Sequence, residues 1–449
     1  MKFGFVNDQN MALLTDLYEL TMAQSYFDAG MNDTAVFDFF ARGAKKRSYL
    51  LSAGLEQVLY YLQNIRFCDE DIAYLRETGR FSDHFLNYLK EFRFSGDLYA
   101  VDEGEILFGN EPFITVEAPL IEAQIVETFI INTMQLSILV ATKAMRCRSV
   151  AEDTALVDFG LRRAHGTDAG MKAARCAYIG GFAGTSNVLA AKTFDIPAFG
   201  TMAHSFILAH ESEEEAFAHF LETYPENSIL LVDTFDTING VEQAVKAVKR
   251  AGLSDFRGIR LDSGEIERLA KKSRLILDRE GFEKAMIFVS GGLNEYKIRE
   301  LMRKGAPIDG WGVGTELVVS ADTPYLDCAY KLVEYAGRPK MKLSPDKVTL
   351  PSKKQIFRRY EKGIIAEDTI ALRDEKIEGR PLMKRYIQRG EIVIDPPSLE
   401  TVRQKARESF DTLPPELKEI DSTHMPLPSL GPGLSETMKK LKADIESSL

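Results

Sequence analysis

The feature that most constrains the fold is a repeating pattern that begins at Ala155. Short apolar runs alternate with small polar clusters and amphipathic helical segments up to about residue 317. The runs are "ALVDFG", "CAYIGGFAGTS", "PAFGTMAHS", "SILLVDTFD", "FRGIRLDSG", "AMIFVSGG" and "DGWGVGTEL". Strands that alternate with helices pair in parallel, and strands without polar alternation are buried on both faces. The pattern therefore predicts an α/β domain built on a parallel sheet.

An open doubly wound sheet and a closed β/α barrel both satisfy this pattern, and the polar residues separate them. Each apolar run carries Gly, Ser, Thr, His, Asp or Glu at or near its C-terminal end. In a β/α barrel the functional groups come from the C-terminal ends of several strands. This distribution favours the barrel, with a functional site at its rim.

The segments on either side of the repeat have a different character. Apolar spacing predicts mainly helices over residues 13–93, strands and tight turns over 97–119, and a long helical stretch from about 120 to 150. Strands and turns return after about residue 325, and the tail from Pro396 adds a helix or two. We expect an N-terminal α+β domain at 1–120, a β/α barrel at 121–325, and a C-terminal segment at 326–449 that packs on the N-terminal domain.

Composition and charge narrow the class of protein. The 449 residues are 45% hydrophobic, so the chain can bury a large core. The formal net charge of −11 argues against non-specific binding to nucleic acid or to an anionic membrane. The start of the chain has no basic segment followed by an apolar core, and no apolar run is long enough to cross a bilayer. The sequence predicts a cytoplasmic protein with no nucleic-acid or membrane partner.

The cysteines point to the same compartment. They lie far apart and form no CxxC pair, which is typical of a reducing environment. Each is best interpreted as a small buried hydrophobe rather than as a nucleophile or a metal ligand. The four residues are Cys68, Cys147, Cys176 and Cys328. We expect no metal site built from protein ligands.

Two polar segments that follow predicted strands carry cations. "DFGLRRAHG" places Arg162 and Arg163 just past a strand, and a guanidinium group can bind phosphate through its planar fork of donors. "GIRLDSGE" brings together Arg260, Asp262 and Ser263, which suit a phosphate, a sugar hydroxyl and a metal-bound water. Simpler alternatives are solvated surface charge for the arginine pair, and a turn closed by Arg260 and Asp262 with Ser263 capping the next helix.

Two glycine-rich turns come immediately before helical segments near the end of the repeat. Glycine lets backbone amides approach an anion closely, and the start of the following helix adds a favourable dipole. Paired phosphate-binding turns after the last strands recur in β/α barrels. The glycines are Gly291 and Gly292 in "VSGGLN", and Gly312 and Gly314 in "GWGVGTEL".

His204 and two carboxylates complete the set of candidate groups. His204 follows small and apolar residues in "GTMAHSF", where a histidine is usually a packed core residue. At the end of a barrel strand, however, it could act as a base, an acid or a phosphoryl acceptor. Asp233 and Asp236 in "VDTFDT" are carboxylates at another strand end, and one of them could be an N-cap for the helix that follows.

These segments occur together in an order that resembles the nicotinate phosphoribosyltransferase family over most of the chain. The matching motifs are "LLTDLYELTMAQSYF", "DFGLRRAHG", "GTSNV", "GTMAHSF", "VDTFDT", "RLDSG", "VSGGLNE" and "GVGTEL". The resemblance implies an irregular α/β barrel joined to an α+β domain, in a homodimer with active sites at the subunit interface. It implies formation of nicotinate mononucleotide and pyrophosphate from nicotinate and phosphoribosyl pyrophosphate, with Mg²⁺ and with coupling to ATP hydrolysis.

The resemblance also implies roles for individual residues. Phe159, together with Tyr18 of the partner subunit, would sandwich the pyridine ring of the substrate. Arg162, favoured over Arg163 by the motif, and Arg260 would hold the phosphates, and Asp262 would contact the ribose hydroxyls or the magnesium ion. The turn glycines would line the site of the 5′-phosphate. They are Gly291, Gly292, Gly312 and Gly314.

The histidine takes its role from the same resemblance. His204 would be the residue that ATP phosphorylates, and Asp233 would orient it or relay a proton. The cysteine-rich metal element that some members carry near the C-terminus has no ligands here, because the last cysteine is Cys328.

Related enzymes are the main alternatives to this interpretation. In the nicotinamide phosphoribosyltransferases an aspartate follows the Gly-Thr of the "GTSNV" motif and accepts a hydrogen bond from the amide. Ser186 occupies that position here, and a hydroxyl suits the carboxylate of nicotinate. Quinolinate phosphoribosyltransferase ranks third because it is shorter and uses no ATP. A barrel that only binds a ligand remains an alternative. A class I aldolase would need a buried lysine at a strand end, and none of the apolar runs of this chain ends in lysine.

Overall fold

The computed structural model describes residues 4–44, 46–343 and 349–448. It divides into two compact units. Unit 1 combines the N-terminal part of the chain up to Leu139 with the part from Tyr325 onward, and unit 2 is Val140–Pro324. Unit 1 thus combines N- and C-terminal segments of the chain. The first boundary between the units falls inside helix α6 (Glu127–Val150), whereas the sequence pattern placed it at residue 120.

Unit 2 contains the parallel sheet that the repeat predicts. Its strands run in the order β7-β6-β11-β10-β9-β8, and every pair is parallel. An isolated parallel bridge between Thr185 and Ala198 extends the sheet beyond β7. The strands are β6 (Ala155–Asp158), β7 (Gly184–Thr185), β8 (Ile229–Leu231), β9 (Gly258–Leu261), β10 (Met286–Ser290) and β11 (Gly310–Val313). Strands that are adjacent in the sheet are thus consecutive along the chain, except that β11 pairs with β6, as in a β/α barrel. The sheet is irregular because β7 and the bridge at Ala198 are so short.

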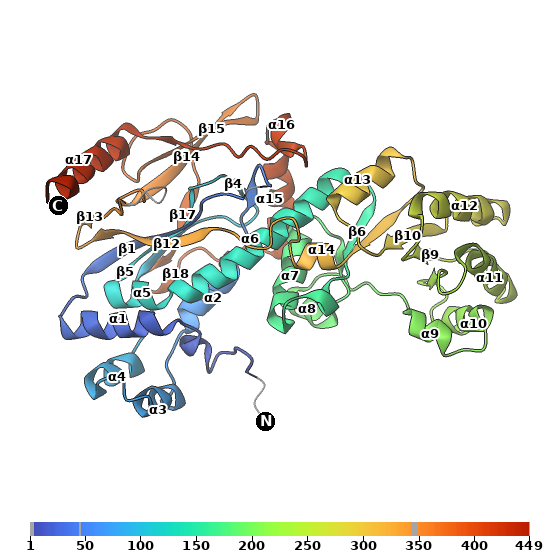
Figure 1. Ribbon diagram of the computed structural model, residues 1–449, viewed down its shortest axis with the longest axis horizontal. Coiled ribbons are helices and arrows are strands. Elements are labelled where there is room, and N and C mark those ends of the chain that lie inside the picture. Colours follow the sequence, from blue (N-terminus) through green and yellow to red (C-terminus); the bar gives the residue numbers. More distant parts are fainter. Residues whose placement is uncertain (1–3, 45, 344–348, 449) are drawn as a thin grey trace. The chain divides into compact units, whose positions relative to one another are not determined.

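Helices alternate with these strands along the chain. Figure 1 shows α10, α11 and α12 packed side by side next to the β9 and β10 strands. Amphipathic segments such as α11 bury one face, with Val241, Ala244 and Val248 fully enclosed. The helical segments are η2 (Leu161–Arg163), α7 (Thr167–Ile179), α8 (Val188–Phe194), α9 (His204–Leu208), α10 (Glu213–Thr223), α11 (Thr237–Arg250), α12 (Ile266–Arg279), α13 (Glu295–Arg303) and α14 (Thr315–Val318).

Two of the runs form shorter strands than the sequence pattern predicts. The residues "CAYI" of "CAYIGGFAGTS" end helix α7, and only Gly184–Thr185 forms a strand. Similarly, "PAFGTMAHS" contributes one bridge residue, Ala198, before α9 begins at His204. The error arises because a short apolar run does not distinguish a strand from the buried end of a helix.

Unit 1 is built around an antiparallel sheet in the order β13-β12-β1-β5-β3-β17-β18. Its strands are β1 (Thr34–Ala41), β3 (Asp97–Val101), β5 (Pro112–Pro119), β12 (Cys328–Tyr335), β13 (Arg338–Pro339), β17 (Met383–Gln388) and β18 (Glu391–Ile392). Strand β1 was not anticipated within the mainly helical segment 13–93. It is central, paired with β12 and β5, and buried from Ala35 to Ala41, so it shows no polar alternation in the sequence.

Smaller sheets and several helices complete unit 1. The sheet β16-β14-β15-β19 is formed by β14 (Lys354–Glu361), β15 (Ile364–Leu372), β16 (Arg380–Pro381) and β19 (Ser429–Leu430), and β2 (Leu50–Leu51) pairs with β4 (Ile106–Leu107). The helices are η1 (Met11–Leu13), α1 (Leu17–Asp28), α2 (Leu55–Asn64), α3 (Asp69–Glu77), α4 (Asp83–Lys90), α5 (Leu120–Ile125), α15 (Leu399–Asp411), α16 (Pro415–Lys418) and α17 (Pro432–Ser448). Residues 344–348 of the expected strand-rich segment lie outside the described residues.

Helix α6 falls within the long helical stretch expected from about residue 120 to 150, but it is more apolar than the sequence interpretation allowed. By length and composition alone it could cross a membrane. However, 67% of its most apolar window is buried inside the protein, as in the core helix of a folded domain. Its apolar character is therefore explained by packing.

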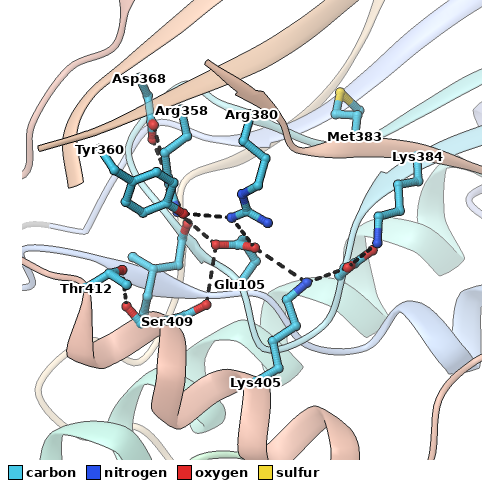
Figure 2. A network of polar contacts seen from close by, with 12 residues as sticks. Glu105, Arg358, Tyr360, Asp368, Arg380, Met383, Lys384, Lys405, Ser409 and Thr412 are labelled. Carbon is cyan, nitrogen blue, oxygen red and sulfur yellow. Dashed lines mark hydrogen bonds and ion pairs between the residues drawn. The ribbon is translucent and has the colours of Figure 1, made fainter. Parts of the chain in front are cut away.

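A network of charged side chains is buried in unit 1 (Figure 2). Arg358 is fully enclosed and donates through Nη1 to Oε1 of Glu105 at 2.9 Å. Its Nε and Nη2 donate to the two carboxylate oxygens of Asp368 at 2.8 and 2.6 Å. Arg380 donates to the second oxygen of Glu105 at 2.8 Å. Because each charge has an opposite partner with good geometry, the network offsets the cost of removing these groups from water.

Candidate active site

The polar residues of unit 2 lie at the C-terminal ends of the parallel strands. Asp158 ends β6, Thr185 ends β7 and Ser290 ends β10, while Asp233 and Asp262 follow β8 and β9 closely. Because the strands are parallel and adjacent, these ends meet at one edge of the sheet. These strand ends therefore form one rim, and the hydrogen bonds across it show how closely its residues approach one another.

Two aspartates and two serines join three strand ends. Oδ2 of Asp233 accepts from the backbone N–H of Asp262 at 3.0 Å and from the hydroxyl of Ser263 at 2.7 Å. The hydroxyl of Ser290 in turn donates to Oδ1 of Asp262. Ser263 thus does not cap the following helix, whose N-cap is Glu265. These contacts hold both carboxylates in fixed orientations before any ligand binds.

Arg260 is buried beside this carboxylate pair. Its side chain is 13% exposed, and Nη2 lies 3.7 Å from Oδ1 of Asp262. Nη1 donates to the carbonyl oxygen of Met202 at 3.0 Å and to the hydroxyl of Thr201. Nε is buried without a partner among the described residues. Arg260 therefore has an unused donor, although its other groups are fixed.

Arg162 lies in the 3₁₀ turn η2, just past the C-terminal end of β6, and so belongs to the same edge of the sheet. Burial lowers the pKa of the Arg260 guanidinium. The carboxylates of Asp262 and Asp233 oppose this shift, whereas the positive charge of Arg162 adds to it. Arg162 and Arg163 are both exposed in the 3₁₀ turn η2. Arg260 and Arg162 thus bring two guanidinium groups to one rim, where they could bind an anion despite the acidic charge of the chain.

His204 is a half-buried residue at the rim and not a packed core histidine. It begins α9, and its Nδ1 lies 3.1 Å from the hydroxyl of Thr234. Thr234 directly follows Asp233, so the ring is held by the neighbour of the carboxylate expected to orient it. Asp236 is the N-cap of α11, where its side chain accepts from the N–H of Asn239. The N-cap that the sequence allowed for one of the two aspartates is therefore Asp236.

Phe159 lies half-buried against the last strands of the sheet. Its ring centroid is 5.6 Å from that of Phe288. A Cβ added at Gly312 would come within 2.4 Å of the Phe159 ring, and one at Gly314 within 3.1 Å of the Phe159 carbonyl oxygen. These two glycines therefore leave room for the aromatic residue, in addition to any phosphate that they line.

The other glycine pair forms the turn between β10 and α13. Gly291 and Gly292 have φ values of +88° and +58°, which side chains rarely adopt. A Cβ at Gly291 would come within 2.0 Å of the carbonyl oxygen of Asp262, whereas nothing lies within 4 Å of one at Gly292. The turn is thus packed against the Asp262 segment on one side and open on the other.

Tyr18 and Ser186 lie in different units. Tyr18 is on α1 in unit 1, is 46% exposed, and has its phenol next to Glu127. Burial and that carboxylate raise the pKa of the phenol above its ordinary value. Ser186 follows β7 in unit 2, is half-buried, and its hydroxyl makes no hydrogen bond with the residues that the structure describes. Its hydroxyl is therefore free for a ligand.

Sequence reasoning missed several residues that hold the site together. They are Asp158, Thr185, Thr201, Thr234 and Ser290, each of which hydrogen bonds to a neighbouring segment of the rim. Their positions in the sequence could have indicated them, since each stands at or just past the end of an apolar run. The choice of partner was not visible, because it depends on which strand ends are neighbours in space.

Two carboxylates of the rim have the chemistry to hold a magnesium ion together with substrate phosphates. No cluster of three or more His, Cys, Asp or Glu residues that could hold a metal occurs within residues 4–44, 46–343 and 349–448. Oδ1 of Asp233, however, is buried without a hydrogen-bond partner among these residues. Mg²⁺ commonly binds one or two carboxylates together with substrate phosphates. Asp233 and Asp262 could supply those carboxylates.

Comparison with known proteins agrees with this geometry. Residues 13–135 match the nicotinate phosphoribosyltransferase N-terminal domain, and residues 154–366 match the nicotinate phosphoribosyltransferase family. A nicotinate phosphoribosyltransferase of Mycobacterium tuberculosis is 47% identical, covering 92% of this chain and 89% of its own. One of Bacillus subtilis is 40% identical, covering 86% and 81%.

A solved structure shares the whole architecture. The human nicotinic acid phosphoribosyltransferase superposes with a TM-score of 0.84 at 26% identity, over 95% of this chain and 99% of its own. The nicotinate-nucleotide pyrophosphorylase of Pyrococcus furiosus gives a TM-score of 0.76 at 26% identity, over 92% and 99%. These neighbours confirm the irregular barrel with a second α+β domain. The chain belongs to the nicotinate phosphoribosyltransferase family.

Proposed function

We propose that the protein forms nicotinate mononucleotide and pyrophosphate from nicotinate and phosphoribosyl pyrophosphate, and that it couples this reaction to ATP hydrolysis. The observation that carries the proposal is that Asp233, Arg260 and Asp262 are joined at one rim, where Arg162 stands just past the end of β6. A doubly phosphorylated sugar needs both cations for its phosphates and acceptors for its hydroxyls. The family and its curated members support the same activity.

The reaction requires charge placement more than it requires a nucleophilic side chain. The pyridine nitrogen attacks the anomeric carbon of the ribose while pyrophosphate leaves, and the sugar becomes cation-like between the two events. Arg260 and Arg162 would neutralise the departing pyrophosphate, and Asp262 would hold the ribose hydroxyls. Bound Mg²⁺ would add positive charge on the pyrophosphate oxygens. The preformed hydrogen bonds of the rim spare the enzyme reorganisation at the moment of reaction.

The pyridine ring would bind next to Phe159. The half-buried ring of Phe159 offers one stacking face, and Tyr18 of the partner subunit would offer the other. Exposed apolar side chains on and near α1 support a homodimer of this kind. They are Leu14, Leu17 and Tyr18, which are 36%, 47% and 46% exposed. The free hydroxyl of Ser186 would donate to the carboxylate of nicotinate.

A direct assay tests the proposed reaction. Purified protein is mixed with phosphoribosyl pyrophosphate, Mg²⁺ and either nicotinate or nicotinamide, with and without ATP, and the mononucleotide is quantified. We expect product from nicotinate, in larger amount with ATP. Product from nicotinamide but not from nicotinate would instead identify the protein as a nicotinamide phosphoribosyltransferase.

ATP coupling is expected to depend on His204. Since Nδ1 is hydrogen bonded with Thr234, Nε2 is the ring nitrogen left to accept a phosphoryl group. Phosphorylation would change the charge of the rim and favour substrate binding, and hydrolysis would then release product. His204→Asn should therefore abolish the ATP cleavage that accompanies each nucleotide formed, measured as phosphate released per mononucleotide.

The matched control is His219→Asn, which alters an exposed histidine on α10. It should leave the ratio of phosphate to mononucleotide unchanged. A His204→Asn enzyme that still cleaves ATP in fixed proportion to product would contradict the phosphohistidine.

Substrate choice is expected to depend on Ser186. In Ser186→Asp a second carboxylate would lie close to that of nicotinate, and repulsion of about 1–2 kcal/mol would raise the KM for nicotinate about tenfold. Ser254→Asp adds the same charge at an exposed turn of unit 2 and should leave this KM unchanged. An unaltered nicotinate KM in Ser186→Asp would show that Ser186 does not read the carboxylate.

A further inference from the structure

We propose that Asp158 is a positioning residue for the pyridine substrate. The buried carboxylate of Asp158 joins the turn that carries Phe159 to the turn that carries Ser186. It thereby fixes the distance between the ring of Phe159, which stacks on the substrate, and the hydroxyl of Ser186, which binds the carboxylate of nicotinate. The inference rests on the proposed function, because it assumes that Phe159 and Ser186 contact the same ring.

The hydrogen bonds of Asp158 run to both turns. The residue ends β6 and is 1% exposed. Oδ1 accepts from the backbone N–H of Gly160 at 2.8 Å, and Oδ2 accepts from the hydroxyl of Thr185 at 2.6 Å. Its carbonyl oxygen also accepts from the N–H of Ser186 at 2.8 Å. One residue therefore contacts the segments on either side of the predicted ring position.

The Thr185 end of this connection is itself fixed. Thr185 is fully buried, and its hydroxyl accepts from the N–H of Asn187 at 3.0 Å while it donates to Asp158. Asn187 caps α8 by accepting from the N–H of Ala190 at 3.1 Å. Ser186 lies between these two fixed residues, yet its own hydroxyl has no hydrogen-bond partner in the part of the chain that the structure describes. The backbone around Ser186 is thus rigid where its side chain is available to a ligand.

The Phe159 end is equally constrained. The N–H of Phe159 donates to the carbonyl oxygen of Val313 in β11 at 2.9 Å. A Cβ added at the next residue, Gly160, would come within 2.0 Å of Val318 and 3.0 Å of Oδ1 of Asp158. The turn is therefore packed so tightly that loss of a hydrogen bond at Asp158 would displace the Phe159 ring.

A carboxylate serves this position better than an amide. Asp158 receives two donors, one on each oxygen, and these hydrogen bonds oppose the rise in pKa that burial causes. Asparagine has only one acceptor oxygen, so it can retain the N–H of Gly160 only if its amide group faces the hydroxyl of Thr185. The hydroxyl proton of Thr185 would then have to point away from residue 158, and the hydrogen bonding between the two turns would weaken.

The experiment measures Michaelis constants for both substrates in Asp158→Asn, Thr185→Val, Thr185→Ser and the double variant Asp158→Asn/Thr185→Val. We expect the KM for nicotinate to rise about tenfold in Asp158→Asn and in Thr185→Val, because a small displacement of a positioned group weakens binding sharply. The KM for phosphoribosyl pyrophosphate should stay within about twofold. Thr185→Ser keeps the hydroxyl and should restore the wild-type value.

The double variant isolates the interaction between the two side chains. If the hydrogen bond between Asp158 and Thr185 carries the effect, the double variant should be no worse than the more impaired single variant. Asp309→Asn is the matched control, because its Oδ2 also accepts a backbone N–H, from Ile287 at 2.8 Å, at the opposite end of the strands. It should leave both KM values unchanged.

Three results would overturn the inference. They are equal rises in both KM values, additive losses in the double variant, and an unchanged nicotinate KM in Thr185→Val. The threonine pair keeps the test decisive should Asp158→Asn fail to fold. A wild-type enzyme that makes no mononucleotide would refute the proposed function and this inference with it, whereas an active wild type with any of the three results would refute only the inference.

Discussion

Arg260→Lys is expected to lower kcat/KM for phosphoribosyl pyrophosphate by about a hundredfold or more, as when one preorganised donor to developing charge is lost. Arg260 uses Nη1 to bind Met202 and Thr201 and still presents a buried Nε without a partner among the described residues. Lysine keeps the charge but has no second donor group at that distance, so it cannot hold the Met202 segment and a phosphate together. Initial rates of mononucleotide formation at varied phosphoribosyl pyrophosphate measure the loss.

Arg268→Lys is the control for this prediction. Arg268 lies on α12 in the same unit, is 60% exposed, and pairs with Glu265 three residues earlier. Its replacement should change kcat/KM by less than about twofold, because exposed ion pairs contribute little. Full activity in Arg260→Lys would mean that the guanidinium fork has no part in binding the phosphates.

Arg358→Met is expected to destabilise unit 1 by about 3–5 kcal/mol. The substitution removes a buried donor from two carboxylates, Glu105 and Asp368, that are 3% and 4% exposed. Both charges would then be buried with fewer donors, or would have to take up protons. Urea unfolding followed by far-UV circular dichroism measures the change in the free energy of unfolding.

The fluorescence of the single tryptophan distinguishes the unfolding of unit 2 from that of unit 1. Trp311 is in β11 of unit 2 and is fully buried, so its fluorescence follows the unfolding of that unit. Arg359→Met is the control, since the neighbouring Arg359 side chain is 38% exposed and should cost less than about 1 kcal/mol. Equal midpoints for Arg358→Met and the wild type would show that the network in Figure 2 contributes no net stability.

The barrel was predictable because its signal is repeated. Seven apolar runs with polar ends recur along one stretch of chain, so an error in one run leaves the pattern intact. The same reasoning failed for "TAVFDFFA", the central strand β1, which stands alone among helices and is buried on both faces. A single buried strand lacks the period-two alternation that identifies strands at a solvated surface.

The site was predictable as a set of residues but not as a set of contacts. Arg260, Asp262 and Ser263 were found because they are neighbours in the sequence. Asp158 and Thr185 were missed because their bond joins strand ends 27 positions apart. Similarly, the partner of His204 proved to be Thr234, 30 positions along the chain. Sequence spacing shows which groups are at strand ends, whereas the strand order decides which of them meet.

The most direct test of the account is a crystal structure of the protein with bound nicotinate mononucleotide. The central claim is that the C-terminal ends of the parallel strands form one nucleotide site. We predict the pyridine ring against Phe159 with its carboxylate at Ser186, and the phosphate at the turn of Gly291 and Gly292. Density for the nucleotide away from these strand ends, with Arg260 and Asp262 unchanged and free of ligand, would contradict it.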